Sequence, residues 1–217
     1  MKLLMQAERQ AVIDYCRRMS DIGLTAGTSG NISLFNRDDQ CMAISPSSMD
    51  YQAMTPSDIV VMDINAKVVD GDRRPSTEYG MHLACYQRRP DIGAVVHNHS
   101  PAATTLAILG WDLPAVHYMI GYSGGATIRC APYELFGTPE LADAGVIYMG
   151  SGYGCLLANH GVLAAGPNIG HAFALAEQIE FCADVYLRAT NAGTPNVLSD
   201  TQVADVIAHF SNYNAQK

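Results

Sequence analysis

The sequence predicts a single α/β domain over residues 1–217, and three observations support this fold class. A length of 217 residues suits one large α/β domain, and a 48% share of hydrophobic residues provides material for its core. Helix-like and strand-like segments are mixed along the whole chain, without the regular βαβ alternation or the G-x-G-x-x-G motif of a nucleotide-binding fold. No linker, internal repeat or low-complexity tract divides the chain.

Six segments have the apolar spacing or the end signals of helices. In the first, Val12, Ile13, Cys16 and Met19 follow the 3.6-residue period, and the pattern stops near Gly23. The expected helices span residues 5–20, 76–88, 102–109, 138–148, 169–189 and 199–213.

Two of these helices also carry start signals. Thr138 precedes Pro139, which places a capping side chain before a proline in the first turn. Ser199 and Gln202 have the spacing of a capping box, in which each residue satisfies a backbone amide near the other.

Short apolar runs bounded by turn residues have the composition of strands. The expected strands span residues 32–35, 42–44, 59–62, 94–99, 115–120, 126–133, 155–159 and 162–165. The pair Gly124-Gly125 is expected as a turn, and Ser100-Pro101 as the end of the strand before it.

The charge balance excludes some partners. Thirteen Lys and Arg residues against 21 Asp and Glu residues leave a formal charge of −8, without a dense basic run, so binding to nucleic acid is not expected. No apolar stretch reaches the roughly 20 residues of a membrane span. Only 16% of residues are charged, against about 25% in an average protein, which favours a large buried interface.

The cysteines indicate a reducing compartment. The six cysteines show no C-x-x-C spacing and mostly have apolar neighbours, as buried thiols do. The apolar run at the start of the sequence is too short for the core of a signal peptide. We therefore expect a cytoplasmic protein.

Three of the seven histidines are candidate metal ligands. His97 and His99 stand two residues apart in an expected strand, so their rings point to the same face and can converge on one ion. His160 interrupts a later apolar run, next to Gly161. Three histidines and an open position are typical of a catalytic zinc site, but the H-x-H spacing alone fits two ordinary hydrogen-bonded histidines equally well.

The other histidines are interpreted as structural. His82 lies four residues after Glu78 and suits a simple pair on a helix surface. Glu78 itself stands at the start of an expected helix. There it fits either a catalytic carboxylate or a partner of the helix dipole, and the second is the commoner role of such a residue.

Three clusters of hydroxyl side chains with glycine or proline are candidate phosphate-binding segments. They lie at residues 27–31, 45–48 and 76–77, and none of them is basic. Each cluster alone is an ordinary turn, but together their hydroxyls and backbone amides suit a single phosphate group.

Five motifs in the same order resemble the class II aldolase/adducin family, and the resemblance covers nearly the whole chain. The motifs are Gly27-Thr28-x-Gly30-Asn31-Ile32-Ser33, Pro75-Ser76-x-Glu78, Val95-Val96-His97-Asn98-His99, Ile128-x-Cys130-Ala131-Pro132-Tyr133-x-x-Phe136-Gly137-Thr138 and Leu198-Ser199-Asp200. The resemblance implies a three-layer α/β/α domain with a mainly antiparallel central sheet. It also implies a fourfold homotetramer with metal sites at the subunit contacts.

The resemblance implies a role for each candidate residue. His97, His99 and His160 match the ligands of one Zn²⁺ per subunit, and Glu78 matches a catalytic acid/base that also fills the fourth zinc position until substrate arrives. Tyr118 matches a catalytic tyrosine from a neighbouring subunit. Tyr213 matches a C-terminal tyrosine on the aldehyde side. The positions that hold the substrate phosphate are matched by Thr28, Asn31, Ser47, Ser48, Ser76 and Thr77.

The reaction implied is reversible cleavage of a ketose 1-phosphate to dihydroxyacetone phosphate and a short aldehyde. Zinc stabilises the enediolate charge, Glu78 moves the proton at C3 with the help of a raised pKa, and Tyr118 exchanges the proton of the C4 oxygen. L-Fuculose 1-phosphate is the first expected substrate, with 5-deoxyribulose or methylthioribulose 1-phosphate as alternatives. A pentulose-phosphate epimerase, a dehydratase and a non-enzymatic adducin-like scaffold also remain open.

Two departures from the family pattern bear on the substrate. Ser47-Ser48 stands where the fuculose enzymes tend to have threonine and glycine, so a side chain at position 48 is expected to narrow or shift the phosphate pocket. Asn159 replaces what is often another histidine before His160.

Overall fold

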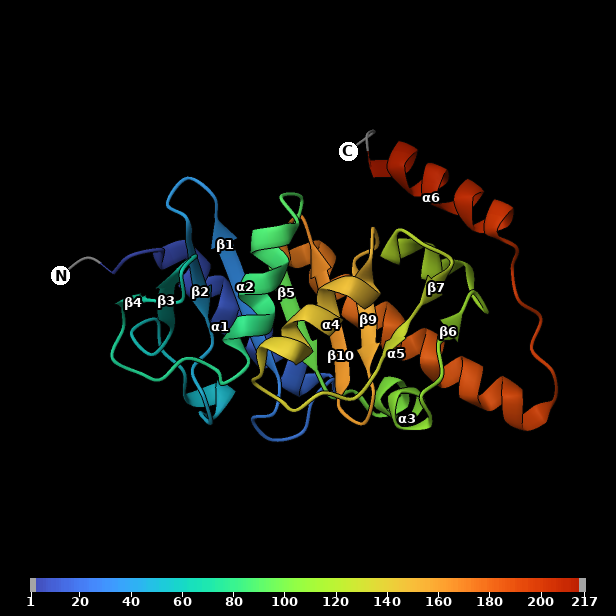
Figure 1. Ribbon diagram of the computed structural model, residues 1–217, viewed down its shortest axis with the longest axis horizontal. Helices are drawn as coiled ribbons and strands as arrows, with labels where there is room; N and C mark the ends of the chain where they lie inside the picture. Colours follow the sequence, from blue (N-terminus) through green and yellow to red (C-terminus); the bar gives the residue numbers. More distant parts are fainter. Residues whose placement is uncertain (1–2, 215–217) are drawn as a thin grey trace.

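An eight-stranded sheet runs through the centre of the computed structural model, which describes residues 3–214 and side chains up to residue 210 (Figure 1). The strand order is β4-β3-β2-β1-β5-β10-β9-β8, and every neighbouring pair is antiparallel except β8 and β9. The strands are β1 (Asn31–Asn36), β2 (Cys41–Ile44), β3 (Val60–Asp63), β4 (Val68–Asp70), β5 (Ala94–Asn98), β8 (Cys130–Ala131), β9 (Gly154–Leu157) and β10 (Gly161–Gly166). The expectation of a mainly antiparallel sheet is confirmed.

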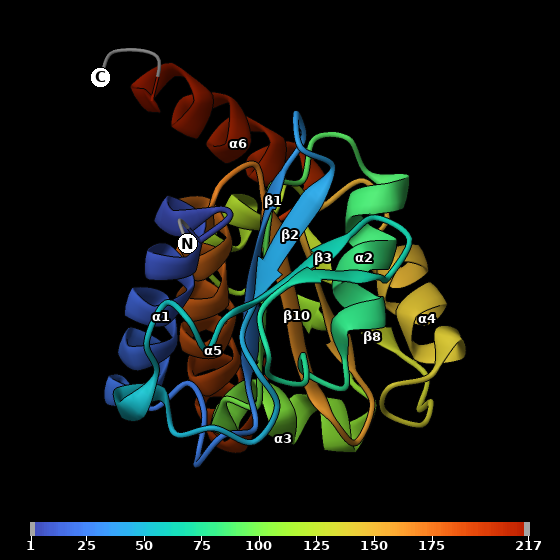
Figure 2. The ribbon, with the colours of Figure 1, turned by 90° about the vertical axis from the view of Figure 1, so that its left-hand side faces the viewer.

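Helices cover both faces of the sheet. Figure 2 shows α1 and α5 on one side and α2 and α4 on the other. The helices are α1 (Gln6–Asp21), α2 (Tyr79–Arg88), α3 (Pro101–Leu109), α4 (Pro139–Met149), α5 (Ile169–Ala192) and α6 (Asp200–Asn214), with short 3₁₀ helices η1 (Tyr51–Ala53) and η2 (Tyr118–Ser123). Each side has its own apolar core, so the domain has the expected three layers.

Strand β5 lies at the centre of this arrangement and is buried along its whole length. Val96 faces the core under α1, α3 and α5, whereas Val95 faces the core under α2 and α4. Because side chains alternate along a strand, His97 points to the same side as Val95. His97 therefore lies on a fully buried strand, and His99 follows directly after its end.

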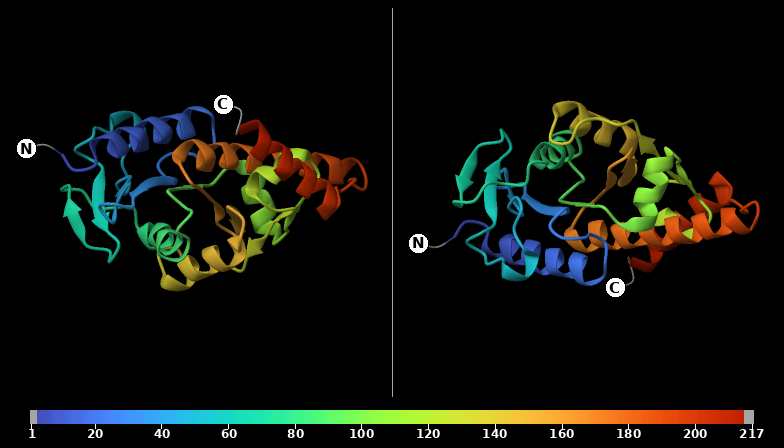
Figure 3. Two further views of the ribbon diagram at one scale, coloured as in Figure 1. Left: turned by 90° about the horizontal axis from the view of Figure 1, so that it is seen from above. Right: turned by 90° about the horizontal axis from the view of Figure 1, so that it is seen from below.

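Both helix starts that carried sequence signals have the expected hydrogen bonds. Thr138 Oγ1 accepts from the backbone N–H of Leu141 at 3.3 Å, with Pro139 in the first turn. At the start of α6, Ser199 and Gln202 bond to each other's backbone N–H groups, as a capping box does. Helix α6 then packs against η2, away from the central sheet (Figure 3).

Two expected strands are wrong. Residues 115–120 form no strand, because the His117 side chain accepts from the backbone N–H of Met119 and starts the 3₁₀ helix η2. Residues 126–133 split into β7 (Thr127–Ile128), which pairs with β6 (Leu113–Pro114) in a separate sheet, and β8 in the main sheet. Short apolar runs look alike in sequence whether they become strands or turns of helix.

Two smaller findings concern the chain as a whole. All six cysteines are free thiols. Over the described residues, every helix is too short or too polar to cross a bilayer.

Candidate metal and catalytic site

Strand β5 brings two of the candidate histidines together. His97 is fully buried, and its Nδ1 donates to the backbone oxygen of Val162 in β10 at 2.8 Å. Nε2 of His97 then lies 3.0 Å from Nε2 of His99, which follows the end of the strand. A backbone acceptor behind the ring is the usual way to fix the tautomer and orientation of a metal-binding histidine.

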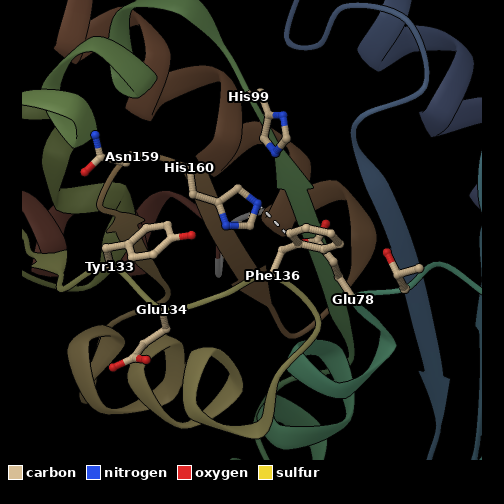
Figure 4. A pocket seen from close by; sticks show the side chains of 8 residues that line it. Glu78, His99, Tyr133, Glu134, Phe136, Asn159 and His160 are labelled. Atoms are coloured by element: carbon tan, nitrogen blue, oxygen red, sulfur yellow. Dashed lines mark ion pairs between the residues drawn. The ribbon is translucent and has the colours of Figure 1, made fainter.

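His160 and Glu78 complete the cluster from other elements. His160 lies in the turn between β9 and β10, where Asn159 has φ 55°, a left-handed conformation that Asn tolerates better than most residues. Glu78 is the residue before the first turn of α2. Its Oε1 lies 3.1 Å from Nε2 of His160 and its Oε2 lies 3.2 Å from Nε2 of His97. Figure 4 shows Glu78 and His160 facing each other.

The four side chains fit a zinc ion. Ligand atoms at 2.0 to 2.1 Å from zinc in a tetrahedron lie about 3.3 Å from one another. The measured separations of 3.0, 3.1 and 3.2 Å come close to this value. The ring nitrogens of the three histidines all lie within 4.8 Å of one another. Three imidazoles and a carboxylate are ligands that zinc takes, so the residues present suit this metal.

The charge states also suit a metal site. Burial, together with the charges of His97 and His160, lowers the pKa of His99 to about 4, so the ring is neutral at pH 7. Burial raises the pKa of the Glu78 carboxyl, but the charges of His97 and His160 and the contacts with their rings outweigh it. The pKa of Glu78 therefore lies well below its ordinary value, and the expectation of a raised pKa is wrong.

Behind Glu78 lie buried polar contacts that the sequence interpretation did not predict, since it gave Asn31 a phosphate-binding role and His82 a place on the helix surface. Asn31 Nδ2 donates to Glu78 Oε2 at 2.9 Å, and Asn31 Oδ1 lies 2.5 Å from Nε2 of His82. His82 is fully buried, so its interpretation as half of a helix-surface pair is wrong. The i, i+4 spacing from Glu78 is right, but this face of α2 is buried against β1, where His82 contacts Asn31 and Ser33. A pairing rule for exposed helices does not apply there.

A cavity of about 290 Å³ opens beside the cluster (Figure 4). Glu78, His99, Asn159 and His160 line it together with Thr77, Tyr133, Glu134 and Phe136. Tyr133 and Phe136 are 58% and 61% exposed. They lie in one of the family motifs, yet the sequence interpretation gave them no role. Two aromatic residues in a loop that also contains proline and glycine could have indicated a binding loop from the sequence alone.

The candidate phosphate-binding segments meet at one end of the sheet. The backbone N–H of Ser47 donates to the oxygen of Arg74 at 2.9 Å, and that of Ser76 donates to the oxygen of Ser45 at 3.1 Å. The Ser45 hydroxyl in turn accepts from Ile32 N–H, next to Asn31. The exposed or partly exposed members are Thr28, Ser47, Ser48 and Thr77, whereas Asn31 and Ser76 are buried.

Of the two candidate tyrosines, the structure describes the side chain of Tyr118 alone. Tyr118 begins η2, is 51% exposed and contacts His117 and Phe210; it is not among the residues that line the cavity. Tyr213 lies in α6, but its side chain is outside the described part of the chain.

The sequence matches one family over most of its length. Residues 10–187 match the family described as Class II Aldolase and Adducin N-terminal domain. A 5-deoxy-D-ribulose 1-phosphate aldolase from Bacillus thuringiensis serovar kurstaki is 46% identical over 99% of this chain and 100% of its own length. An L-fuculose phosphate aldolase from Escherichia coli K12 is 41% identical over 93% of both chains.

A solved structure agrees with these relatives. An L-fuculose 1-phosphate aldolase superposes with a TM-score of 0.94 at 44% identity, over 96% of this chain and 98% of that one. The similarity therefore extends through all the elements that carry the histidine cluster, the cavity and the hydroxyl-rich segments.

Proposed function

This chain belongs to the class II aldolase and adducin family and is an aldolase, and we propose that it uses zinc to cleave a ketose 1-phosphate to dihydroxyacetone phosphate and a short aldehyde. The observation that carries the proposal is the convergence of three imidazoles and the Glu78 carboxylate beside an open cavity. We further propose that residues 1–217 act as one catalytic domain.

His97, His99 and His160 would hold the zinc ion, with Glu78 in the fourth position before substrate binds. The metal supplies Lewis-acid stabilisation of the negative charge that bond cleavage leaves on the substrate oxygens. No lysine stands among the candidate residues, so a Schiff-base route has no nucleophile here.

Glu78 is proposed to carry the proton at C3 of the substrate. Its pKa is held low, so the carboxylate is ready to take this proton in the condensation direction and returns it in the cleavage direction. Its Oε1 lies 3.1 Å from Nε2 of His160, and Glu78 lines the cavity, so this oxygen stands on the side from which substrate arrives.

The phosphate group is proposed to lie among Thr28, Asn31, Ser47, Ser48, Ser76 and Thr77. Backbone contacts join the segments of Ser47 and Ser76, and Thr77 also lines the cavity. Neutral hydroxyls and amides in turns can hold a phosphate without a basic side chain. This arrangement agrees with a chain of net charge −8.

The aromatic rim of the cavity bears on the other end of the substrate. Tyr133 and Phe136 offer apolar surface close to His160 and Glu78. L-Fuculose 1-phosphate and 5-deoxyribulose 1-phosphate both end in a methyl group, and methylthioribulose 1-phosphate ends in a methylthio group. The 46% identity to a 5-deoxy-D-ribulose 1-phosphate aldolase makes 5-deoxyribulose 1-phosphate a specific second candidate beside L-fuculose 1-phosphate.

A homotetramer with shared active sites is part of the proposal. Tyr118 lies outside the cavity of its own chain and is exposed, as is Phe181 at 44%. A neighbouring copy would bring Tyr118 to the C4 oxygen and cover this aromatic surface. Six free thiols are consistent with a cytoplasmic location.

A substrate panel tests the reaction. Release of dihydroxyacetone phosphate is followed with a coupled enzyme for the three ketose 1-phosphates, using wild type and Glu78→Gln, with zinc content measured on each protein. One zinc per chain, turnover by wild type and a large loss in Glu78→Gln are expected. Equal turnover of the two proteins would contradict the role of Glu78, and an epimerised or dehydrated product would contradict the reaction.

Mixed oligomers test the shared site. Glu78→Gln and Tyr118→Phe subunits are each expected to be weakly active alone. After mixing through mild denaturation, activity returns only if some sites combine an intact Glu78 with an intact Tyr118 from different chains. If Tyr118 acted within its own chain, every site would keep one defect and activity would not return. Light scattering of wild type is expected to give the mass of four chains.

A further inference from the structure

The Glu78 carboxylate rests on a continuous row of buried hydrogen bonds that reaches well below the cavity. Asn31 contacts Glu78, His82 contacts Asn31, Ser33 Oγ lies 2.7 Å from Nδ1 of His82, and Tyr86 Oη lies 2.6 Å from Ser33 Oγ. All four supporting side chains are 5% exposed or less. Such a row is costly to bury unless every member is satisfied, so its retention next to an active carboxylate calls for an explanation.

The direction of each hydrogen bond follows from the groups at its ends. A carboxylate oxygen only accepts, so Asn31 turns its Nδ2 toward Glu78 and its Oδ1 toward His82. A carbonyl oxygen also only accepts, so His82 carries its proton on Nε2. The bare Nδ1 of His82 then accepts from the Ser33 hydroxyl.

The row ends at Tyr86, whose hydroxyl is also 3.0 Å from the backbone oxygen of Ser33. Tyr86 donates its single proton to that backbone oxygen or shares it with Ser33 Oγ. The directions of the other hydrogen bonds are set from the Glu78 end of the row, because the carboxylate only accepts.

From this geometry we infer that His82 is a positioning residue for Glu78, acting through the side-chain amide of Asn31. The two ends of an asparagine amide have almost the same shape, so packing alone does not decide which end faces Glu78. The N–H of His82 decides it, because the reversed amide would place N–H against N–H on one side and oxygen against carboxylate on the other. A buried acceptor left without a donor strongly disfavours the reversed amide.

This arrangement gives the two carboxylate oxygens of Glu78 different surroundings. Asn31 holds Oε2, and Oε1 faces the cavity and Nε2 of His160, which lies 3.1 Å away. Burial, followed by the charge of His97, lowers the pKa of His82 to about 3. The ring accordingly stays neutral near pH 7 and holds one tautomer. The inference rests on the proposed role of Glu78 as the acid/base.

The first test compares turnover in matched variants. His82→Leu keeps the bulk of the side chain and removes the N–H, and it is expected to lower kcat about 10- to 100-fold, with a smaller change in KM. His82→Gln keeps an N–H near the position of Nε2 and is expected to recover most of this loss. Tyr86→Phe removes a buried hydroxyl from the same row but leaves the His82 N–H in place, so a kcat near wild type is expected.

A double-mutant cycle asks whether His82 acts through Asn31. On an Asn31→Ala background, His82→Leu is expected to cause no further loss of kcat, because the group it orients is gone. Losses that multiply would overturn the inference, as would a wild-type kcat in His82→Leu.

A second readout needs neither metal nor substrate. Imidazole ¹⁵N spectra of the metal-free protein are expected to show His82 protonated on Nε2 alone, with the signal identified by its absence from His82→Gln. A ring protonated on Nδ1 would overturn the inference, and this test stands even if His82→Leu does not fold. Glu78→Gln separates the two levels. If it keeps full turnover, the proposed function and the positioning role both fail, whereas a loss in Glu78→Gln with none in His82→Leu removes only the positioning role.

Discussion

The candidate metal site and the candidate phosphate-binding segments are neighbours, but they are built differently. The metal-site side chains come from β5, the β9–β10 turn and the start of α2, and His97 and Glu78 are almost completely buried. Except for Asn31 at the start of β1, the candidate phosphate-binding residues lie in loops, and Thr28, Ser48 and Thr77 among them are exposed. Rigid elements hold chemical groups in fixed positions, whereas exposed loops tolerate change. Substitutions in the metal site should therefore affect catalysis much more than substitutions in the loops.

The largest expected effect is loss of the metal. His97→Ala removes a buried proposed ligand whose tautomer is fixed by the backbone oxygen of Val162. Because Lewis-acid stabilisation is worth several kcal/mol, we expect at least about a 1000-fold loss of kcat/KM. Zinc per chain, measured by mass spectrometry, should fall to a small fraction of the wild-type value. The control is His171→Ala, a histidine of α5 outside the cluster, which should keep both zinc and turnover. Full zinc content in His97→Ala would remove this residue from the ligand set.

Gly161 tests how tightly the metal site is packed. A Cβ at this position would lie 2.4 Å from the backbone oxygen of Asn98 and 2.7 Å from Cδ2 of His99, so the turn that carries His160 has to move. Gly161→Ala is expected to lower zinc affinity about 10- to 100-fold, in the range of changes that reorient metal ligands. Competition with a chelator measures it.

The matched control for Gly161 is Gly80→Ala in α2. A Cβ there meets nothing within 4 Å. Helix propensity then favours alanine by about 0.5 to 1 kcal/mol, so this variant should be more stable and should bind zinc normally. Equal zinc affinity in both variants would show that the turn absorbs the added methyl group.

Acid stability separates the two regions in another way. The phosphate-binding side chains do not titrate, but the row under the metal site contains His82, whose pKa is lowered to about 3 in the folded chain against about 6.5 when unfolded. Below pH 6.5, His82 becomes protonated in the unfolded chain but stays neutral in the folded chain. The contribution of His82 to the free energy of unfolding is therefore fully present above pH 6.5, and it is lost progressively as the pH falls toward 3.

The titratable neighbours of His82 are Glu78 on its own helix, His97 on β5 and Tyr86 at the end of the row. For the metal-free protein, we expect the free energy of unfolding to fall by about 2 kcal/mol less in His82→Gln than in wild type between pH 7 and pH 5. Urea unfolding at the two pH values measures this difference, in which the contribution of His99 cancels. Parallel losses in the two proteins would mean that His82 is protonated in the folded state.

The same contrast explains what the sequence predicted and what it did not. The pair His97 and His99 was predictable because strand geometry relates residues two apart. His160 was a weaker inference from a polar break in an apolar run. The burial of His82 was missed, since its spacing from Glu78 is equally good on an exposed face, and only the packing of α2 against β1 decides between them.

Loops and assembly are harder to predict from local patterns. The strand expected at residues 115–120 is a 3₁₀ helix capped by His117, a contact that depends on one side chain and not on any period. Tyr133 and Phe136 reach the cavity only because their loop passes beside His160. The roles of Tyr118 and Tyr213 depend on other subunits and on the end of α6, and these remain predictions.

A smaller effect is expected for a single hydroxyl in the phosphate-binding segments. Thr77→Val removes an exposed hydroxyl next to Glu78 but keeps the shape of the side chain. One lost hydrogen bond to a charged group weakens binding by about 1.5 kcal/mol, which corresponds to roughly a tenfold rise in KM. Little change in kcat is expected. Steady-state kinetics measure both. The result would be contradicted by a kcat that falls as steeply as in the metal-site variants.

The smallest expected effect concerns Ser48, which has φ 56° in the left-handed region. In this region the backbone of an L-residue is strained by about 1 to 2 kcal/mol, whereas glycine is not strained. Part of the stability gained with glycine is lost again, because glycine has more conformational entropy in the unfolded chain. Ser48→Gly is therefore expected to raise the free energy of unfolding by about 0.5 to 1 kcal/mol.

Ala66 is the matched control for Ser48, because it has φ 68° in the turn between β3 and β4, outside the candidate phosphate-binding residues. Ala66→Gly should give a similar gain in stability and an unchanged KM. In Ser48→Gly the backbone amide stays in place and, unlike Thr77, Ser48 is not among the residues that line the cavity, so KM should rise less than about threefold. A larger rise in KM for Ser48→Gly alone would show that the hydroxyl binds the phosphate directly. An equal gain in stability with no change in KM in either variant would show that the side chain at position 48 only destabilises the backbone conformation and does not contribute to phosphate binding.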